Sequence, residues 1–328
     1  MALRIIRKST SQSHVEIIRG TATDSKASFS VLCYLQKQEQ LEAFKRLIYE
    51  SKEISEHAEI IFMKSTEVQE ALRPHFEALP HNIKLMSAPE KASLSRCLRT
   101  LVQEAGTDIC WYLPWAPAPE ELNWLPEALS FLKSNPNHAA AGPILYHQEK
   151  LISAGQSMVL DMPTHQLNLN QNSYTVNAGK EKIWNIGKDI ARTDWQSLKH
   201  GYAPVPALPL ELLLFSRSTY LGLSWEDSNW AAEWVSQDIC IGLHQQQYWV
   251  HLLPFYVQAP EPVLQDLLTN SVSMPDTFAQ RWRPVFRETL FDTYPVLGLK
   301  ETSEKSFQAQ PPQETDPVAS YFAALKVS

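Results

Sequence analysis

Asp238 is a carboxylate whose position and neighbours could allow chemistry. It lies in the stretch SQDICIGLHQQQYWVHLLP at 236–254, which has the pattern of a helix followed by a strand. A carboxylate in a cleft can serve as a general base, whereas the neutral hydroxyl of Ser236 cannot accept a proton near neutral pH. The structural alternative for Asp238 is a helix carboxylate that caps backbone or pairs with a cation.

Lysine and tryptophan side chains supply the other candidates. Lys64 follows the apolar run EIIFM, where a cation could neutralise an anionic ligand or simply face solvent. Trp230, Trp234 and Asp238 are spaced four residues apart, which places them on one face of a helix. Together with Trp225 these tryptophans could stack on a sugar, but tryptophan at helical spacing is more often core, and we favour packing.

Several classes of function have no support in the sequence. The net charge of −7 is spread without basic runs, which argues against nucleic-acid binding, and no apolar run is long enough to span a membrane. The first twenty residues lack a signal-peptide core, so we expect a cytoplasmic protein. Only ten glycines are present and none form a phosphate-binding loop. No cysteine pair or histidine spacing fits a metal site.

Alternating strand and helix patterns fill the first half of the chain. Continuous apolar runs predict strands buried on both faces, and apolar positions three and four apart predict helices between them. This alternation predicts an α/β fold with a mostly parallel sheet flanked by helices. The expected strands are 29–35, 59–63, 83–89 and 109–113, and the expected helices are 38–52, one from Thr66, 93–106, and 122–135 interrupted by Pro126.

The flanking segments differ from this core. Residues 1–24 alternate apolar and polar residues, which predicts a β hairpin, and 25–260 is expected to be one domain. Residues 261–328 are expected to form a helical extension and a polar, flexible tail. The Asn- and Gln-rich stretch at 166–176 is expected to be a polar loop.

Four segments, in order, resemble the family-2 glycosyltransferases of the GT-A fold. GPILYHQEKLISAG resembles the family's Gly-Pro-x-Leu, turn and Ile-x-x-Ala-Gly, and LLLFSRSTYLGL places Arg217 three residues before Tyr220 as the family does. The stretch around Asp238 resembles the Glu-Asp-x-Asp-Leu-Cys-Leu-Arg-Leu helix, with Tyr248 and Pro254 at the family's spacing. More weakly, DTFAQRWRP is similar to the Phe-x-x-Lys/Arg-Trp near the family's C-terminal end.

The resemblance implies a GT-A fold, but the positions that perform the family's chemistry are changed. The family holds a divalent metal with an Asp-x-Asp after the fourth strand, and those positions are Pro114, Trp115 and Ala116 here. The general base falls on Ser236, and Asp238 matches the second, mostly structural Asp. Because a hard cation needs oxygen ligands, we expect no divalent metal or other cofactor.

The positions that would hold a donor nucleotide sugar follow from the same resemblance. They are Tyr34 on the first strand, Lys64 after the second, Arg96 on the third helix, and Trp115, which could plug the donor pocket. A carboxylate delivered from the 160–200 segment remains open, with these candidates: Asp161, Asp189 and Asp194.

Two functions are therefore carried forward. The first is a non-catalytic relative of the family-2 glycosyltransferases that binds a glycan, a nucleotide sugar, a partner protein or a catalytic glycosyltransferase in a glycosylation or polysaccharide pathway. The second is an active, metal-independent glycosyltransferase that uses Lys64 or Arg96 against the leaving diphosphate. The loss of both the metal ligands and the base favours the first.

Overall fold

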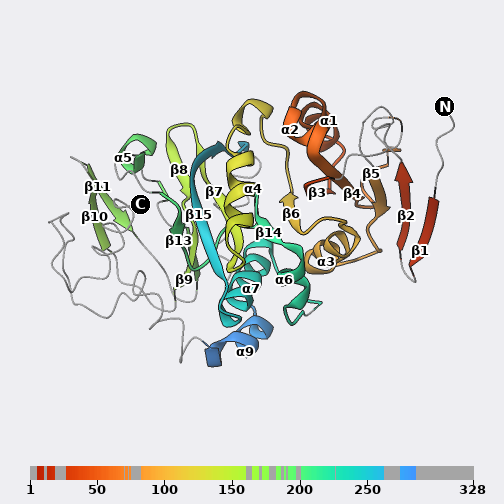
Figure 1. Ribbon diagram of the computed structural model, residues 1–328. Helices are drawn as coiled ribbons and strands as arrows, with labels where there is room; N and C mark the ends of the chain where they lie inside the picture. The colour runs from red at the N-terminus through yellow and green to blue at the C-terminus, as the bar shows by residue number, and fades with distance from the viewer. Residues whose placement is uncertain are drawn as a thin grey trace. The chain divides into compact units, whose positions relative to one another are not determined.

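The protein is a mixed α/β structure in which a large sheet is flanked by helices, as the alternating pattern predicts (Figure 1). The computed structural model describes residues 6–10, 13–18, 27–69, 71–72, 74, 83–159, 165–169, 172–176, 182–185, 188–189, 191–196, 201–225, 227–261 and 274–285. The description below refers to these residues.

The chain divides into two compact units, each built from separate stretches of sequence. Unit 1 comprises 1–142, 210–235 and 242–249, and unit 2 comprises 143–209, 236–241 and 250–328. The sequence led us to expect one domain at 25–260 between two appendages. The contacts divide the chain differently because its later segments return to strands formed by the first 142 residues.

The sheet of unit 1 has four parallel strands at its centre. Their spatial order is β5-β4-β3-β6, and each neighbouring pair is parallel. Antiparallel strands extend both sides, with β2 and β1 beyond β5, and β14 and β7 beyond β6. The bounds are β1 Ile6–Thr10, β2 Ser13–Ile18, β3 Phe29–Leu35, β4 Ala58–Lys64, β5 Ile83–Ser87, β6 Ile109–Leu113, β7 His138–His147 and β14 Leu214–Ser216.

Helices cover both faces of these central strands. Figure 1 shows α1 and α2 on one side of β3 and β4, and α3 and α6 on the other. Apolar residues of α1 and α3 face the sheet and are fully buried, among them Phe44 and Leu98. The bounds are α1 Gln40–Glu50, α2 Lys52–His57, α3 Leu94–Glu104, η2 Pro119–Glu121, α4 Leu125–Ser134, α6 Arg217–Gly222 and α7 Ala232–Gln245.

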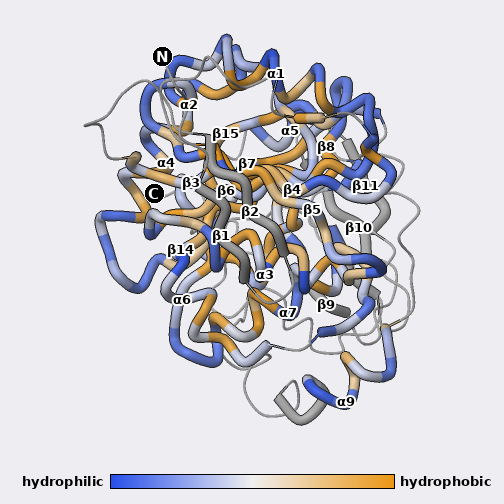
Figure 2. Tube along the Cα trace, turned by 90° about the vertical axis from the view of Figure 1, so that its right-hand side faces the viewer, coloured by the Kyte–Doolittle hydropathy of each residue, from blue (hydrophilic) through white to orange (hydrophobic). Residues whose placement is uncertain are grey.

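The core follows the continuous apolar runs of the sequence. All five residues of β6 are buried, and β3 buries six of its seven residues, as strands covered on both faces must. In Figure 2 the tube is orange, or hydrophobic, along β4, β6 and β7. Burial of these side chains is the main favourable term in the folding of this unit.

Unit 2 is built on antiparallel pairs. Its half of β7 pairs with β8 and neighbours β15, which pairs with β13. A second small sheet joins β9 to β12, and a hairpin joins β10 to β11. The bounds are β8 Lys150–Ser153, β9 Gln156–Val159, β10 His165–Leu169, β11 Asn172–Val176, β12 Lys182–Asn185, α5 Arg192–Gln196, β13 Ala203–Pro204, β15 Trp249–Gln258 and α9 Asp276–Val285.

Two predicted helices differ from the structure. Where a helix was expected from Thr66, the structure has a turn at 66–67, and the Ser65 side chain accepts a hydrogen bond from the Glu67 amide at 3.2 Å. A local serine bond of this kind competes with helix formation. Pro126 does not interrupt a helix, because α4 begins at Leu125 and places the proline in its first turn, where a missing amide proton costs nothing.

The stretch expected to be a polar loop is the β10–β11 hairpin, with Leu169 paired to Asn172. Its composition is polar, but its residues alternate in the period of two that a strand needs, and the composition masked that signal. The segment expected to be an N-terminal hairpin contains the antiparallel pair β1–β2. The expected polar tail at 300–316 lies outside the described residues.

Candidate functional site

The carboxyl ends of β3 and β6 form a topological switch point in unit 1. From β3 the chain builds β4 and β5 on one side and then crosses to β6 on the other. In open α/β sheets, ligands bind beyond the carboxyl ends of the strands at such a point. The strand register places Leu35 beside Lys64, and Cys33 beside Leu113, so the loops after these strands begin at one edge.

Gln40 fixes the two loops that leave this edge. Its side-chain oxygen accepts hydrogen bonds from the amides of Gln36 and Lys37 at 2.8 and 2.9 Å. Its side-chain nitrogen donates to the carbonyl oxygen of Pro114 at 2.8 Å. One side chain therefore ties the loop after β3 to the loop after β6, which holds the switch point in a defined geometry.

Tyr34 lies at the end of β3 and reaches the first turn of α3. Burial raises the pKa of its phenol well above the ordinary value, and a hydrogen bond with the Cys97 thiol and the nearby charge of Glu67 raise that pKa further. The phenol therefore stays protonated and neutral, and its role is to donate a hydrogen bond or to pack. The structure thus places Tyr34 against Cys97, the residue that follows Arg96 in α3.

Lys64 is the last residue of β4 and is partly buried. Its ammonium group donates a hydrogen bond to the carbonyl oxygen of Val68 at 3.2 Å, across the turn that replaces the expected helix. This contact holds the ammonium group near the sheet edge. A cation at this place can meet an anionic ligand at the switch point.

Trp115 is nearly enclosed, with 6% of its surface exposed. Its indole nitrogen is buried and, among the described residues, has no hydrogen-bond partner. The side chains of Pro114, Trp115 and Ala116 offer no oxygen ligand after β6, so these three positions do not fit a divalent metal. A buried indole donor without an acceptor is unusual, and a ligand that reached this loop could supply one.

Arg96 lies in the first turn of α3 and is paired with Asp227. The distance from its guanidinium Nη1 to Asp227 Oδ2 is 3.6 Å, and about a third of the Arg96 side chain is exposed. Ser93, the N-cap of α3, donates a hydrogen bond to the other carboxylate oxygen of Asp227 at 2.5 Å. This cluster and the switch-point loops belong to the same unit.

Asp238 lies in unit 2 and is held by two side chains of α9. Arg281 Nε is 3.1 Å from Asp238 Oδ1, and the indole nitrogen of Trp282 donates to the same oxygen at 2.8 Å. Asp238 and Arg281 are only 15% and 17% exposed. The carboxylate therefore neutralises a cation and fastens α9 to α7, which agrees with the structural reading of Asp238.

Ser236 is completely buried two residues earlier on the same helix. Its hydroxyl donates a hydrogen bond to the carbonyl oxygen of Leu208, so it is used inside the protein and does not face a substrate. Nearby, burial raises the pKa of the Cys240 thiol to about 12, despite opposing hydrogen bonds with Leu208 and Ser236. That thiol is therefore protonated and unreactive at neutral pH.

Uncharged amides continue this polar region in unit 2. Gln237 donates to Gln156 at 3.4 Å, and Gln156 donates to Asn185 at 3.0 Å. All three are at least nine-tenths buried. Buried amides that satisfy one another fix the packing of α7 without carrying charge.

The remaining candidates are scattered. Asp161 lies outside the described residues, Asp189 is exposed in a turn with φ of 66°, and Asp194 is buried in α5. Trp230 and Trp234 are 6% and 1% exposed, which confirms packing rather than a sugar-stacking wall.

Trp225 is different from the other two tryptophans. It is 38% exposed, and the Arg99 guanidinium lies 5.3 Å from the centre of its ring.

Since α7 begins at Ala232, Trp230 precedes the helix and does not share a helical face with Asp238.

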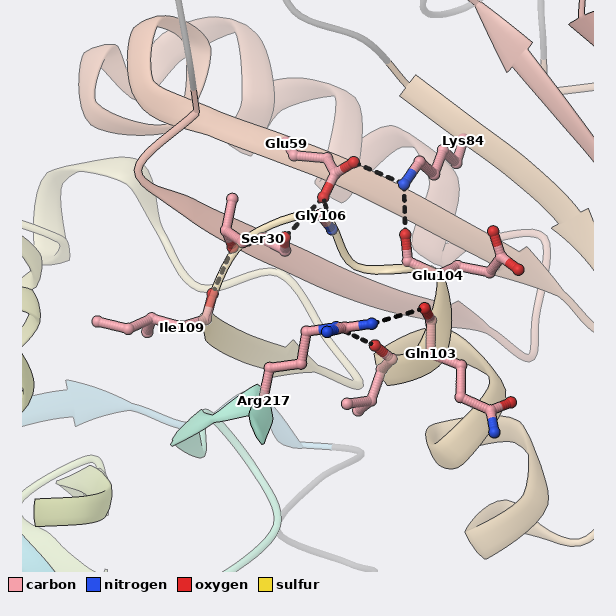
Figure 3. A network of polar contacts seen from close by, with 10 residues as sticks. Ser30, Glu59, Lys84, Gln103, Glu104, Gly106, Ile109 and Arg217 are labelled. Carbon is pink, nitrogen blue, oxygen red and sulfur yellow. Dashed lines mark hydrogen bonds and ion pairs between the residues drawn. The ribbon is translucent and has the colours of Figure 1, made fainter. Parts of the chain in front are cut away.

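A polar network with a structural role lies at the amino ends of strands β3, β4 and β5 (Figure 3). Glu59 pairs with Lys84 at 2.8 Å and accepts hydrogen bonds from Ser30 and the Gly106 amide, both at 2.7 Å. Arg217, which the resemblance singled out, donates to the last-turn carbonyls of α3 at 3.0 and 3.1 Å. Its role here is to cap a helix.

Sequence reasoning missed the partners of Arg96. Ser93 gives a recognisable N-cap signal, but nothing local marks Asp227, which is 134 residues from Ser93 in the chain. Gln40 was missed for a similar reason, since its contact with Pro114 spans 74 residues. Pairings of this length follow from the chain path and not from local spacing.

Three broader observations complete the description. Among the described residues, no group of three or more His, Cys, Asp or Glu side chains is placed to hold a metal ion. No helix in that part of the chain has the length and apolar character needed to cross a membrane. No protein-family model matches the chain, and no curated protein matches it.

Proposed function

We propose that this chain is a GT-A-type, glycosyltransferase-like protein that acts by binding and does not transfer sugar. Its ligand is a nucleotide sugar or a glycan of a glycosylation or polysaccharide pathway, received at the carboxyl edge of β3 and β6. Binding there supports a partner protein or a catalytic glycosyltransferase. The α/β topology and the four sequence segments support this assignment together.

One observation carries the non-catalytic part of the proposal. Both residues that fall at the family's acidic motif are engaged within the protein: Ser236 is buried against Leu208, and Asp238 is paired with Arg281 and Trp282. A general base must reach the acceptor hydroxyl, and neither group is free to do so in this arrangement.

The binding part of the proposal rests on the switch point. Its loops are tied together by Gln40, and Lys64 and Arg96 bring positive charge to the same unit. The indole donor of Trp115 is buried without a partner among the described residues. A phosphorylated sugar ligand offers acceptors for cations and for such a donor.

A ligand titration tests the proposal. UDP-, GDP- and dTDP-sugars, each with and without Mn²⁺, should be added while the thermal midpoint is followed. We expect one donor class to raise the midpoint by a few degrees, saturably and independently of Mn²⁺, because a ligand stabilises the state it binds. Lys64→Ala should weaken this shift, whereas Lys45→Ala, which removes a lysine paired with Glu42 on α1, should leave it unchanged.

The same samples distinguish the alternative, an active metal-independent glycosyltransferase, which the cations Lys64 and Arg96 favour. Release of nucleoside diphosphate that is lost in Lys64→Ala but insensitive to chelators would establish that alternative. Turnover that requires Mn²⁺, or the absence of any shift with nucleotide sugars and with glycan oligosaccharides, would contradict the proposal.

A further inference from the structure

The amino end of α3 is occupied by a carboxylate from a distant loop. Asp227 accepts a hydrogen bond from the Ser93 hydroxyl at 2.5 Å and pairs with Arg96 at 3.6 Å. The Ser93 hydroxyl in turn accepts the Arg96 amide at 3.1 Å, as an N-cap does. One oxyanion therefore lies on a helix terminus, a hydroxyl and a guanidinium at once.

The first turn of α3 is suited to an oxyanion for physical reasons. Unsatisfied amides and the helix dipole give the amino end of a helix a partial positive charge. This turn contains no acidic residue, and its one charged side chain is Arg96. Phosphate groups bind at helix termini with these features.

A second observation at the same turn concerns Ser228. The Ser95 hydroxyl accepts a hydrogen bond from the Ser228 amide at 3.3 Å and donates one to the Ser228 carbonyl oxygen at 3.0 Å. Ser228 therefore borders the first turn of α3. Ser228 is 7% exposed, and its own hydroxyl is buried without a hydrogen-bond partner in the part of the chain that is described. A buried hydroxyl of this kind is left over for an additional acceptor.

We propose that the first turn of α3 is a binding site for a phosphate-type oxyanion, and that Asp227 occupies this site within the molecule until such a ligand displaces it. The incoming oxyanion exchanges with the carboxylate at Ser93 and Arg96 and gains the Ser228 hydroxyl. This inference rests on the proposed function: it names the chemical class of the ligand and says how ligand binding is regulated in unit 1, which contains the switch point.

Displacement of Asp227 is inexpensive in this geometry. The side chains of Arg96 and Asp227 are 36% and 42% exposed, and half-exposed ion pairs contribute little to stability. The hydroxyl–carboxylate hydrogen bond to Ser93 is replaced by an equivalent bond to phosphate. The neighbouring Cys97 is hydrogen-bonded to Tyr34, so a ligand at this turn lies beside a residue of the switch-point strand β3.

Pyrophosphate binding to Asp227 variants tests the inference. The wild-type chain, Asp227→Asn and Asp227→Ala should be titrated with pyrophosphate, UDP and uridine by calorimetry, after thermal unfolding shows that each variant is folded. We expect Asp227→Ala to bind pyrophosphate and UDP about tenfold more tightly than wild type, because the competing carboxylate is gone. Asp227→Asn removes the charge but keeps an acceptor, and should show a smaller gain.

Two further variants make the result specific. Asp189→Asn removes one negative charge from an exposed turn of unit 2 and should not change pyrophosphate affinity. Adding Arg96→Gln to Asp227→Ala should abolish the gain. If Asp227→Ala increases the affinity for pyrophosphate and for UDP equally, the site binds the diphosphate group. If the increase for UDP is larger than the increase for pyrophosphate, the site binds a nucleoside diphosphate.

Equal affinities in wild type and both Asp227 variants, an equal gain in Asp189→Asn, or a gain with uridine would overturn the inference. These outcomes differ from failure of the proposed function. Nucleotide-sugar binding by wild type without any effect of Asp227 leaves the function standing alone. Tighter pyrophosphate binding by Asp227→Ala, without nucleotide-sugar or glycan binding, leaves the oxyanion site standing alone.

Discussion

At the scale of single residues, Asp238 shows that the residue type alone does not determine what a side chain does. The residue type permits general-base chemistry, but its two neighbours on α9 make it a partner in an ion pair and in a hydrogen bond with an indole donor. The Arg281 guanidinium also lies 4.9 Å from the centre of the Trp282 ring. The carboxylate and the guanidinium thus neutralise each other, and the indole contacts both.

Asp238→Asn tests this structural role. The amide can still accept from Trp282 but removes the carboxylate charge that faces the partly buried Arg281, so we expect a loss of about 1–3 kcal/mol in the free energy of unfolding. Urea denaturation followed by tryptophan fluorescence measures the change. Asp189→Asn, at an exposed site, should have little effect. An unchanged midpoint in Asp238→Asn would show that α9 is not fastened through this carboxylate.

At the scale of elements, α3 is defined by what meets its two ends. Its amino end receives Ser93 and the Asp227 carboxylate, and its carboxyl end receives cations from Arg217 and Lys84. Each contact satisfies terminal groups that the helix itself leaves unpaired, and each charge complements the helix dipole. The helix is short, so these terminal contacts matter for its stability.

Arg217→Met tests the carboxyl-terminal cap. The aliphatic stem is retained while two hydrogen bonds to Val102 and Gln103 carbonyls are lost, so we expect a destabilisation of about 1–2 kcal/mol. Arg46→Met on α1 is the matched control, since that arginine forms an exposed pair with Glu50 and its loss should be much less costly. Equal midpoints in chemical denaturation for the two variants would contradict the assigned role of Arg217.

At the scale of the whole molecule, the four cysteines report on burial in both units. They are Cys33, Cys97, Cys110 and Cys240, and each is buried and free. Burial raises the pKa of every one of these thiols, to about 12 in Cys240. None should therefore react with a thiol reagent in the folded protein at pH 8, and all four should react after unfolding.

The same pKa shifts predict a dependence of stability on pH. The folded chain binds these thiol protons more tightly than the unfolded chain, so this stabilisation is complete below pH 9 and is lost as pH rises toward 12. Guanidinium midpoints at several values between pH 8 and 11 measure the loss, which should be shallower in Cys240→Ala. Two results would contradict the assigned burial: a thiol that reacts within seconds at pH 8, or a guanidinium midpoint that increases as the pH is raised beyond 9.

Much of the fold could be predicted from the sequence because its signals are local. The apolar run FSVLCYL has no polar face, so it must be buried on both sides, and it forms β3 at the centre of the parallel strands. The helical spacing of Leu41, Phe44, Leu47 and Ile48 likewise defines the buried face of α1. Errors arose where a local signal was ambiguous, as at Thr66 and in the polar hairpin β10–β11.

The amino-acid sequence by itself determined which residue types are present at the edge of the sheet, including Lys64, Trp115 and Pro114, whose side chain offers no oxygen ligand after β6. Only the tertiary structure decided what those residues do, because their partners come from segments far apart in the chain. Asp227 reaches Ser93, Gln40 reaches Pro114, and α9 reaches Asp238. Local spacing carries no information about such contacts, since they exist only after the chain has folded back on itself.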